Sequence, residues 1–219
     1  MEITMQKIKK TAAHLPQKYA DWLALEDKGT DTNKDFRTHY DDIVMNLYQC
    51  QQGVCAYTEA FICPAELYGE NNWANGKYKI ANDAAFTRVD HRGELQHFDA
   101  SKKKAQYWNW DNLFMIEARI NSIKTNKPVA IYLKPDVADY SPEKYFDYDE
   151  ETHRFIPNTA IDDDAMVAEI RKMIDEVLCL NHGVVLKDRE NYIKELKDKK
   201  QRGQDYTVDR FFTAVKWVV

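Results

Sequence analysis

Apolar residues recur with helical spacing through the first fifty positions. One series runs through residues 8–23, and a second, which includes Ile43, Val44 and Leu47, runs through residues 36–48. The polar stretch GTDTNKD separates the two series. Side chains three and four residues apart share one face of a helix, so the pattern predicts two or three packed α-helices.

Shorter apolar runs, typical of β-strands, follow in the middle of the chain. We expect strands at residues 54–57, 85–90 and 94–98, with a long polar loop at residues 68–79. The aromatic-rich run that ends in Leu113-Phe114 then leads into a segment with Ile116, Ile120 and Ile123 at helical spacing. Pro128 should end this short helix, because proline lacks the N–H that a helix interior needs.

The last third of the sequence reads as a hairpin followed by helices. Residues 142–157 predict two strands joined by the acidic turn DEETH. Residues 162–180 have one broad apolar face, whereas residues 187–202 are highly charged. We therefore expect an α+β protein, in which the first of these helices packs on the core and the second stays accessible to a partner or to solvent.

Length and composition favour one compact globular body. The chain has 219 residues, of which 44% are hydrophobic, and it contains only seven glycines and six prolines. Its four cysteines are too few and too irregularly spaced for a disulfide framework. The N-terminus lacks the apolar core of a signal peptide, and no apolar run reaches the roughly 18 residues of a membrane span. We therefore expect a cytoplasmic protein with no membrane partner.

The net charge of −5 is not that of a general nucleic-acid binder, so any basic surface must be local. Five lysines flank the central segment: Lys102, Lys103, Lys104, Lys124 and Lys127. Acidic residues collect elsewhere, at 147–151 and 162–164. The lysines are either a solvated face or contacts for the phosphates of a nucleic acid.

Three residues of the central segment stand in an order that carries chemical meaning. His97 ends a predicted strand, Asn112 follows it by fifteen residues before an apolar strand, and Asn121 lies nine residues further on, in the predicted helix. Taken singly, each has a purely structural explanation, as a strand-end histidine, a turn former and a helix surface residue. Their joint order and spacing favour a shared functional role over three separate structural ones.

Several ordered motifs resemble those of a known family. They comprise the lysine-rich start KIKK, Trp22, Gln51-Gln52-Gly53-Val54-Cys55-Ala56-Tyr57, Gln96-His97-Phe98, Trp110-Asp111-Asn112-Leu113, Asn121-Ser122-Ile123-Lys124, Tyr145-Phe146-Asp147-Tyr148-Asp149 and Leu178-Cys179-Leu180-Asn181. In this order they resemble the HNH nucleases of the ββα-metal fold, and among them the PtuB nuclease subunits of the Septu and retron antiphage systems. The resemblance covers most of the chain.

The resemblance implies a fold and a division of the chain. It places an HNH-like ββα-metal core at residues 54–128, between an N-terminal helical region, 1–53, and a C-terminal hairpin and helical region, 129–219. It also implies an effector subunit that cuts DNA or RNA, with DNA the favoured substrate, beside an ABC-type ATPase. The terminal residues Phe211, Phe212 and Trp217 are candidates for docking on that partner, because interfaces often centre on a few aromatic anchors.

The same resemblance assigns roles to the site residues. His97 would be the general base, and Asn112 would orient its imidazole through its side chain or its backbone carbonyl. Asn121, with Gln96 beside the histidine, would offer oxygen atoms to one Mg²⁺ or Mn²⁺. Lys124, Lys127 and the run Lys102 to Lys104 would hold flanking phosphates.

Two departures from the family pattern change the expectation. Only Cys55 remains where related nucleases carry two cysteine pairs, so we expect no structural zinc, although Cys50, Cys55 and Cys63 leave a rearranged site open. Gln96 stands where the family has an acidic residue, which weakens metal binding. The alternative function is therefore an HNH-derived binding or scaffold subunit with weakened catalysis.

Two further alternatives stay open. Asp90 and His91 form a rival acid and histidine pair, although His91 falls at the predicted turn. Trp108 and Trp110 either stack on exposed bases or belong to the core.

Overall fold

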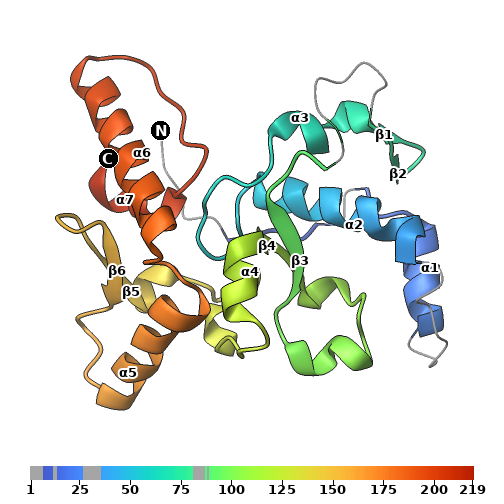
Figure 1. Ribbon diagram of the computed structural model, residues 1–219, viewed down its shortest axis with the longest axis horizontal. Coiled ribbons are helices and arrows are strands. Elements are labelled where there is room, and N and C mark those ends of the chain that lie inside the picture. The colour runs from blue at the N-terminus through green and yellow to red at the C-terminus, as the bar shows by residue number, and fades with distance from the viewer. Residues whose placement is uncertain (1–6, 12–13, 27–35, 81–86, 88) are drawn as a thin grey trace. The chain divides into compact units, whose positions relative to one another are not determined.

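A computed structural model describes residues 7–11, 14–26, 36–80, 87 and 89–219 (Figure 1). By their contacts these residues form two units. The N-terminal unit comprises the described residues of 9–55 and 62–118, and the C-terminal unit comprises residues 7–8, 56–61 and 119–219. The chain therefore passes between the units several times, and these divisions cross the region boundaries predicted at 53/54 and 128/129.

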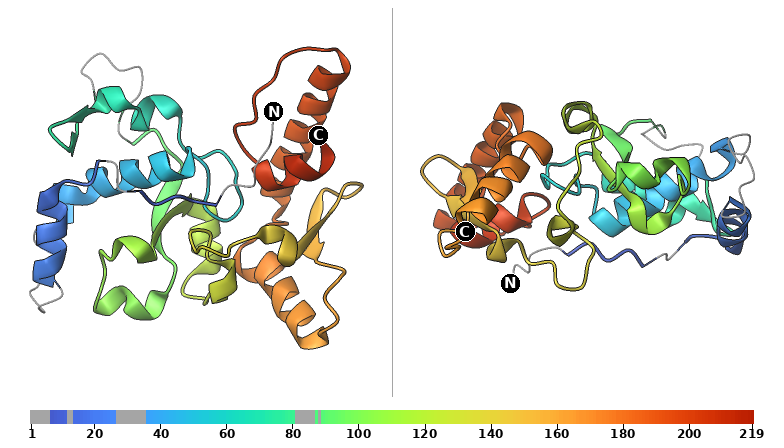
Figure 2. Two further views of the ribbon diagram at one scale, coloured as in Figure 1. Left: turned by 180° about the vertical axis from the view of Figure 1, so that it is seen from behind. Right: turned by 90° about the horizontal axis from the view of Figure 1, so that it is seen from below.

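Two helices begin the N-terminal unit, as the spacing predicted: α1 (Gln17–Glu26) and α2 (Phe36–Gln51). Ile43, Val44 and Leu47 of α2 are buried, and the helix packs against strand β4 (Leu113–Glu117) (Figure 2). At the end of α2, the side-chain amide of Gln51 accepts the N–H of Met115 at 2.9 Å and donates to its carbonyl at 2.8 Å. Gln51 thus bonds to β4 as a neighbouring strand would.

The segment after α2 differs from the sequence-based expectation in two places. Residues 54–57 do not form a strand; they follow a tight turn at Gly53, whose φ is +74° and whose carbonyl accepts the N–H groups of Ile62 and Cys63. The predicted polar loop holds α3 (Ala65–Tyr68), a 3₁₀ turn, η2 (Glu70–Asn72), and a short hairpin of β1 (Trp73–Ala74) and β2 (Lys77–Tyr78). The buried Asp42 of α2 anchors this hairpin through Lys77, at 2.7 Å.

The centre of the N-terminal unit is an antiparallel strand pair. Strand β3 (Gly93–His97) confirms the strand expected at residues 94–98, and it pairs with β4 so that His97 lies opposite Leu113. The connection contains two 3₁₀ turns, η3 (Ala100–Lys104) and η4 (Trp110–Asn112). Half of the strand expected at residues 85–90, namely residues 85, 86 and 88, lies outside the described residues, and the described residues 87, 89 and 90 are not in a strand.

Strand β4 leads directly into helix α4 (Ala118–Lys124), which ends before Pro128 as predicted. Leu113, Phe114, Met115 and Ile116 are all fully buried, so β4 is a central core element although it pairs with only β3 among the described strands. By their contacts, the residues of α4 after Ala118 belong to the C-terminal unit.

The C-terminal unit contains the predicted hairpin, with strands β5 (Phe146–Asp149) and β6 (Arg154–Pro157). Two 3₁₀ turns, η5 (Ile131–Leu133) and η6 (Pro142–Lys144), precede it. Helix α5 (Asp164–Lys172) begins at Asp163, whose carboxylate accepts the N–H groups of Ala165 and Met166, and a π-helical turn, η7 (Met173–Val177), prolongs it. The predicted helix over residues 162–180 is thus confirmed in outline.

The charged helix α6 (Gly183–Gln201) and the terminal helix α7 (Phe212–Val218) correct two expectations. Helix α6 is not accessible on all sides, because Val185, Arg189, Tyr192, Ile193 and Leu196 are buried at helical spacing between its charged residues. The terminal Phe211 and Phe212 are 1% and 6% exposed. They belong to the core of this unit and are not available as anchors for a partner.

Two contacts from distant segments explain the burial of the terminal residues. The guanidinium of Arg189, which is fully buried, donates to the carbonyls of His153 and Leu180 and thereby joins the turn between β5 and β6 to α6. The carboxylate of Glu59 accepts the N–H of Thr213 at 2.8 Å and its hydroxyl at 2.6 Å, so a residue 154 positions earlier caps the start of α7. This cap accounts for the membership of residues 56–61 in the C-terminal unit.

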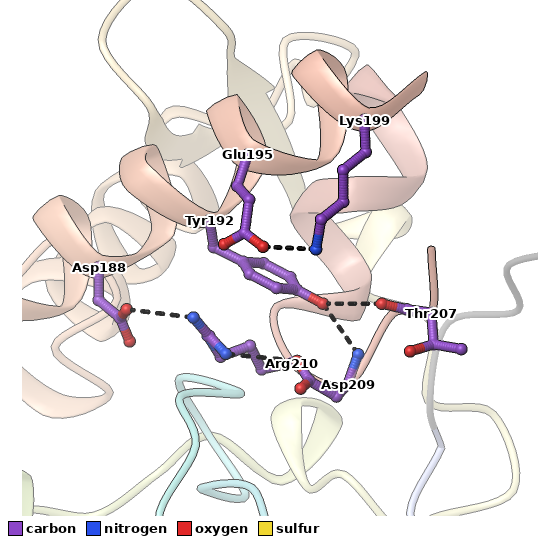
Figure 3. Close-up of polar contacts among 7 residues, drawn as sticks. All are labelled: Asp188, Tyr192, Glu195, Lys199, Thr207, Asp209 and Arg210. Carbon is purple, nitrogen blue, oxygen red and sulfur yellow. Dashed lines mark hydrogen bonds and ion pairs between the residues drawn. The ribbon is translucent and has the colours of Figure 1, made fainter. Parts of the chain in front are cut away.

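The segment between α6 and α7 folds back along α6 (Figure 3). The hydroxyl of Tyr192 accepts the N–H of Asp209 at 2.9 Å, and the guanidinium of Arg210 lies 4.0 Å from the Tyr192 ring centroid. Figure 3 also shows the ion pair of Glu195 and Lys199 along the helix. Every helix in the described part of the chain is too short or too polar to cross a bilayer.

Candidate functional site

The imidazole of His97 is held at the end of β3. It is only 4% exposed, and its Nε2 lies 2.7 Å from the backbone carbonyl of Tyr107. Because a carbonyl only accepts hydrogen bonds, Nε2 carries the proton of the neutral ring, and Nδ1 is its basic nitrogen. The Tyr107 ring meets the imidazole edge to face, with centroids 4.5 Å apart.

Asn112 fixes the backbone that follows His97. Its carbonyl accepts the N–H of Phe98 at 2.8 Å, while its side chain accepts the N–H of Asp99 at 2.8 Å and donates to the carbonyl of Asp99 at 3.0 Å. The expectation that Asn112 itself holds the imidazole is therefore corrected. The Tyr107 carbonyl holds the ring, and Asn112 positions the chain on which the ring is carried.

The other site residues of the N-terminal unit are close to His97 in sequence. Gln96 is buried, and its amide nitrogen donates to the carbonyl of His97 at 2.9 Å. Asp99 caps η3 by accepting hydrogen bonds from the hydroxyl and the N–H of Ser101, and these bonds lower the pKa of its carboxyl group. The turn exposes the side chains of three consecutive lysines: Lys102, Lys103 and Lys104.

The remaining predicted residues lie in or after α4. Asn121 is half-exposed on the helix, and Lys127 donates to the carbonyl of Glu176 at 3.1 Å. Lys124 is fully buried, and its ammonium has no hydrogen-bond partner in the described part of the chain. Burial lowers the pKa of Lys124 to about 8. The expectation that Lys124 contacts a phosphate does not fit a side chain enclosed in this way.

The rival pair Asp90 and His91 is directed to other partners. The Nδ1 of His91 lies 2.9 Å from the hydroxyl of Tyr48, and burial lowers the pKa of His91. The Asp90 carboxylate accepts the N–H of Thr87 at 2.6 Å. His97 therefore has the better-defined tautomer, whereas His91 is part of a contact between α2 and the segment that precedes β3.

The two tryptophans have different environments. Trp108 is 1% exposed, its ring packs on Trp22, and its carbonyl accepts the hydroxyl of Tyr19 at 2.6 Å. Trp108 thus belongs to the core and is not available for stacking on a base. Trp110 is half-exposed, and its indole N–H donates to the carbonyl of Lys10 at 3.3 Å.

The four cysteines are free thiols in this structure. Cys55 and Cys63 are buried free thiols, and burial raises the pKa of Cys63 to about 12 and that of the half-buried Cys50 to about 11. Among the described residues, no three His, Cys, Asp or Glu side chains are grouped closely enough to hold a metal ion.

Sequence reasoning missed two residues that shape this site. Tyr107 lies within the aromatic-rich run that ends in Leu113-Phe114, but a backbone carbonyl gives no signal in a sequence. Gln51 belongs to a recognised motif, yet its bonds to Met115 join residues 64 positions apart and could not be predicted.

No family model, curated protein or solved structure matches this chain. The functional proposal therefore depends on the geometry of the site. A pocket of about 340 Å³ between α6 and residues 205–210 is a weaker candidate, because most of its charged groups pair with one another, as do Glu195 with Lys199 and Arg210 with Asp209 (Figure 3).

Proposed function

We propose that the chain is a metal-dependent HNH-type endonuclease that hydrolyses nucleic acid, in the first place DNA. The observation that carries the proposal is the 2.7 Å contact between His97 Nε2 and the Tyr107 carbonyl, which assigns the proton of the neutral ring to Nε2 and the basic lone pair to Nδ1. The order of elements supports it: His97 ends β3, which pairs with β4, and β4 leads directly into the helix that carries Asn121. The ordered motifs that resemble HNH nucleases support it as well.

In this proposal, His97 removes a proton from the attacking water through Nδ1. A neutral imidazole can accept a proton from water, and a positioned general base contributes roughly 10² to 10⁴ in rate. The Tyr107 carbonyl stabilises the ring once it is protonated, because the Nε2 proton then carries part of the positive charge. Asn112 keeps the backbone beside His97 in place throughout.

The metal in this proposal rests on the family resemblance, which assigns the neutral amide oxygens of Asn121 and Gln96 as ligands of Mg²⁺ or Mn²⁺. These ions usually retain water and take further ligands from a phosphate. A bound cation would polarise the scissile phosphate and stabilise the leaving oxygen. Lys103 and Lys104, which have no ion pair within the described residues, would hold flanking phosphates as exposed charges.

The alternative is a scaffold or binding subunit derived from such a nuclease. Two observations favour it: His97 is almost fully buried, and the Gln96 amide is engaged by the neighbouring backbone carbonyl. In either case we propose an ABC-type ATPase as the partner, on the strength of the family resemblance. Co-purification of the two tagged chains tests that part.

A cleavage assay separates the nuclease from the scaffold. Supercoiled plasmid, circular single-stranded DNA and RNA are incubated with the purified chain in Mg²⁺, in Mn²⁺ and in EDTA. Cleavage of at least one substrate that needs the divalent ion supports the nuclease. Binding without cleavage under all ionic conditions, for the chain alone and with its ATPase, supports the scaffold.

A further inference from the structure

The stretch between His97 and Asn112 presents an aromatic ring and exposed cations side by side. Residues 101–106 are all exposed, and Tyr107 after them is half-exposed. The Lys103 ammonium lies 5.6 Å from the centroid of the Tyr107 ring, and the His97 imidazole meets the same ring edge to face. Tyr107 thus contacts both a cation and the proposed base.

Tyr107 is well placed to receive a flat ligand. Its ring packs edge to face against both His97 and Trp108, at centroid distances of 4.5 and 4.8 Å. These two contacts fix the plane of the ring, which is half-exposed. The flexible side chain of the exposed Lys103 is a further contact, and a ligand would displace it.

Other aromatic residues near the site are not available in the same way. Trp108 and Phe98 are buried, at 1% and 5% exposure. The Trp110 indole is bound to the backbone of Lys10, whose ammonium lies 5.9 Å from the ring centroid. Among these residues, Tyr107 is the one that combines partial exposure with a ring contact to His97.

The cations beside it are suited to a phosphate chain. Lys102 is partly neutralised by Asp99, at 3.8 Å, whereas Lys103 and Lys104 form no ion pair within the described residues. Consecutive lysines on a short turn follow a backbone of phosphates without reading its sequence.

We propose that this site, taken as the nuclease site proposed above, accepts single-stranded nucleic acid, with Tyr107 stacking on an unpaired base and Lys103 and Lys104 on the adjoining phosphates. To stack on a base, the tyrosine ring must take the place of a neighbouring base. A single strand permits this exchange, whereas an intact duplex resists it. Tyr107 would thereby place the adjoining phosphate near His97.

Binding without cleavage tests this inference directly. Fluorescence anisotropy in EDTA compares a labelled single-stranded DNA, an RNA of the same sequence and the corresponding DNA duplex. We expect tighter binding of single strands than of the duplex, and Tyr107→Leu should weaken single-strand binding by about tenfold, since one stacked base contributes a factor of this order. Tyr107→Phe should retain the affinity, and the carbonyl that holds His97 stays in both variants.

Matched controls isolate the contribution of each side chain. Tyr206→Leu changes a half-exposed tyrosine of the C-terminal unit, and Lys194→Ala removes an exposed lysine of α6; neither should alter the affinity. Lys103→Ala should reduce the dependence of log affinity on log salt by nearly one. Circular dichroism verifies that each variant is folded.

The outcomes separate this inference from the nuclease proposal. Single-strand binding that depends on Tyr107, in a protein that cleaves nothing, supports the inference and contradicts the nuclease. Equal binding of duplex and single strand, or an unchanged affinity in Tyr107→Leu, overturns the inference whether or not the protein cleaves. A difference between DNA and RNA identifies which of the two single strands is preferred.

Discussion

Lys124 on α4 is a buried, unpaired ammonium, and its removal should stabilise the protein. The side chain is 0% exposed, and its nitrogen has no hydrogen-bond partner in the described part of the chain. Methionine has a similar length without the charge. We predict that Lys124→Met increases the free energy of unfolding at pH 7.

The size of the effect follows from the pKa. Burial lowers the pKa of Lys124 from 10.5 to about 8. Each pKa unit corresponds to about 1.4 kcal/mol, which gives an upper limit of about 3 kcal/mol for the cost of keeping this charge in the folded state. For a chain of this length, a gain of 1 to 3 kcal/mol should raise Tm by roughly 2 to 10 °C.

The pH dependence has a defined sign. Below pH 8 the lysine is protonated in both states, so the cost of burial is fully present. Between pH 8 and 10.5 the unfolded chain binds more protons than the folded chain, and the stability of the wild type rises with pH. The advantage of Lys124→Met should therefore be greatest at pH 7 and should shrink as the pH approaches 10.5.

Urea denaturation of both proteins from pH 7 to pH 10.5 measures this difference, and groups common to both proteins cancel. Lys127→Met is the matched control on a half-exposed lysine and should change stability by less than about 0.5 kcal/mol. The opposite result would be a Lys124→Met protein that is less stable than the wild type at pH 7, with the same difference in stability at pH 10. The ammonium would then have a stabilising partner, and our account of it would be wrong.

Three other substitutions test the structural assignments. Asn112→Asp removes the donor to the Asp99 carbonyl and places a carboxylate against it, so chemical denaturation should show a loss of about 2 kcal/mol, whereas a neutral result would contradict the role of Asn112. Gly53→Ala should cost more than about 3 kcal/mol, because a Cβ there lies 2.3 Å from the Cys63 carbonyl oxygen at a φ of +74°; an unchanged Tm would show that the turn is not as described. Glu59→Ala leaves the start of α7 uncapped and should lower stability by about 2 kcal/mol. A chain that ends at Asp209 should lose its cooperative melt because Phe211 and Phe212 are buried, whereas removal of an accessible docking tail would leave the melt unchanged.

The elements with strong local patterns were predictable from the sequence. The hairpin of β5 and β6 was found because its strands flank an acidic turn, and α5 was found because its apolar face is continuous. Strand β3, with His97 at its end, was also expected. In these cases the local sequence and the final fold require the same conformation.

The remaining features depend on contacts that a local pattern does not contain. Helix α6 looked exposed because Arg189 counts as a charged residue, yet carbonyls of His153 and Leu180 bind its guanidinium in the interior. The terminal residues looked free because their cap, Glu59, lies 154 positions away. For the same reason Lys124 was expected on the surface, although its neighbours enclose it.

The residues of the candidate site were predictable from the sequence, but their hydrogen bonds were not. The positions of His97 and Asn112 followed from their order along the chain, and the structure places both beside the connection between β3 and β4. Their hydrogen bonds differ from expectation because the backbone of Tyr107, which no residue type reveals, accepts the imidazole N–H.

The most direct test of the proposed function is the rate of metal-dependent cleavage for the wild type, His97→Ala and His91→Ala, measured with enzyme in excess. We predict that His97→Ala lowers the rate by at least about a hundredfold while its far-ultraviolet circular dichroism stays native, and that His91→Ala retains most of the rate. Wild-type cleavage by His97→Ala, together with a loss of cleavage in His91→Ala, would contradict the assignment of His97 as the base.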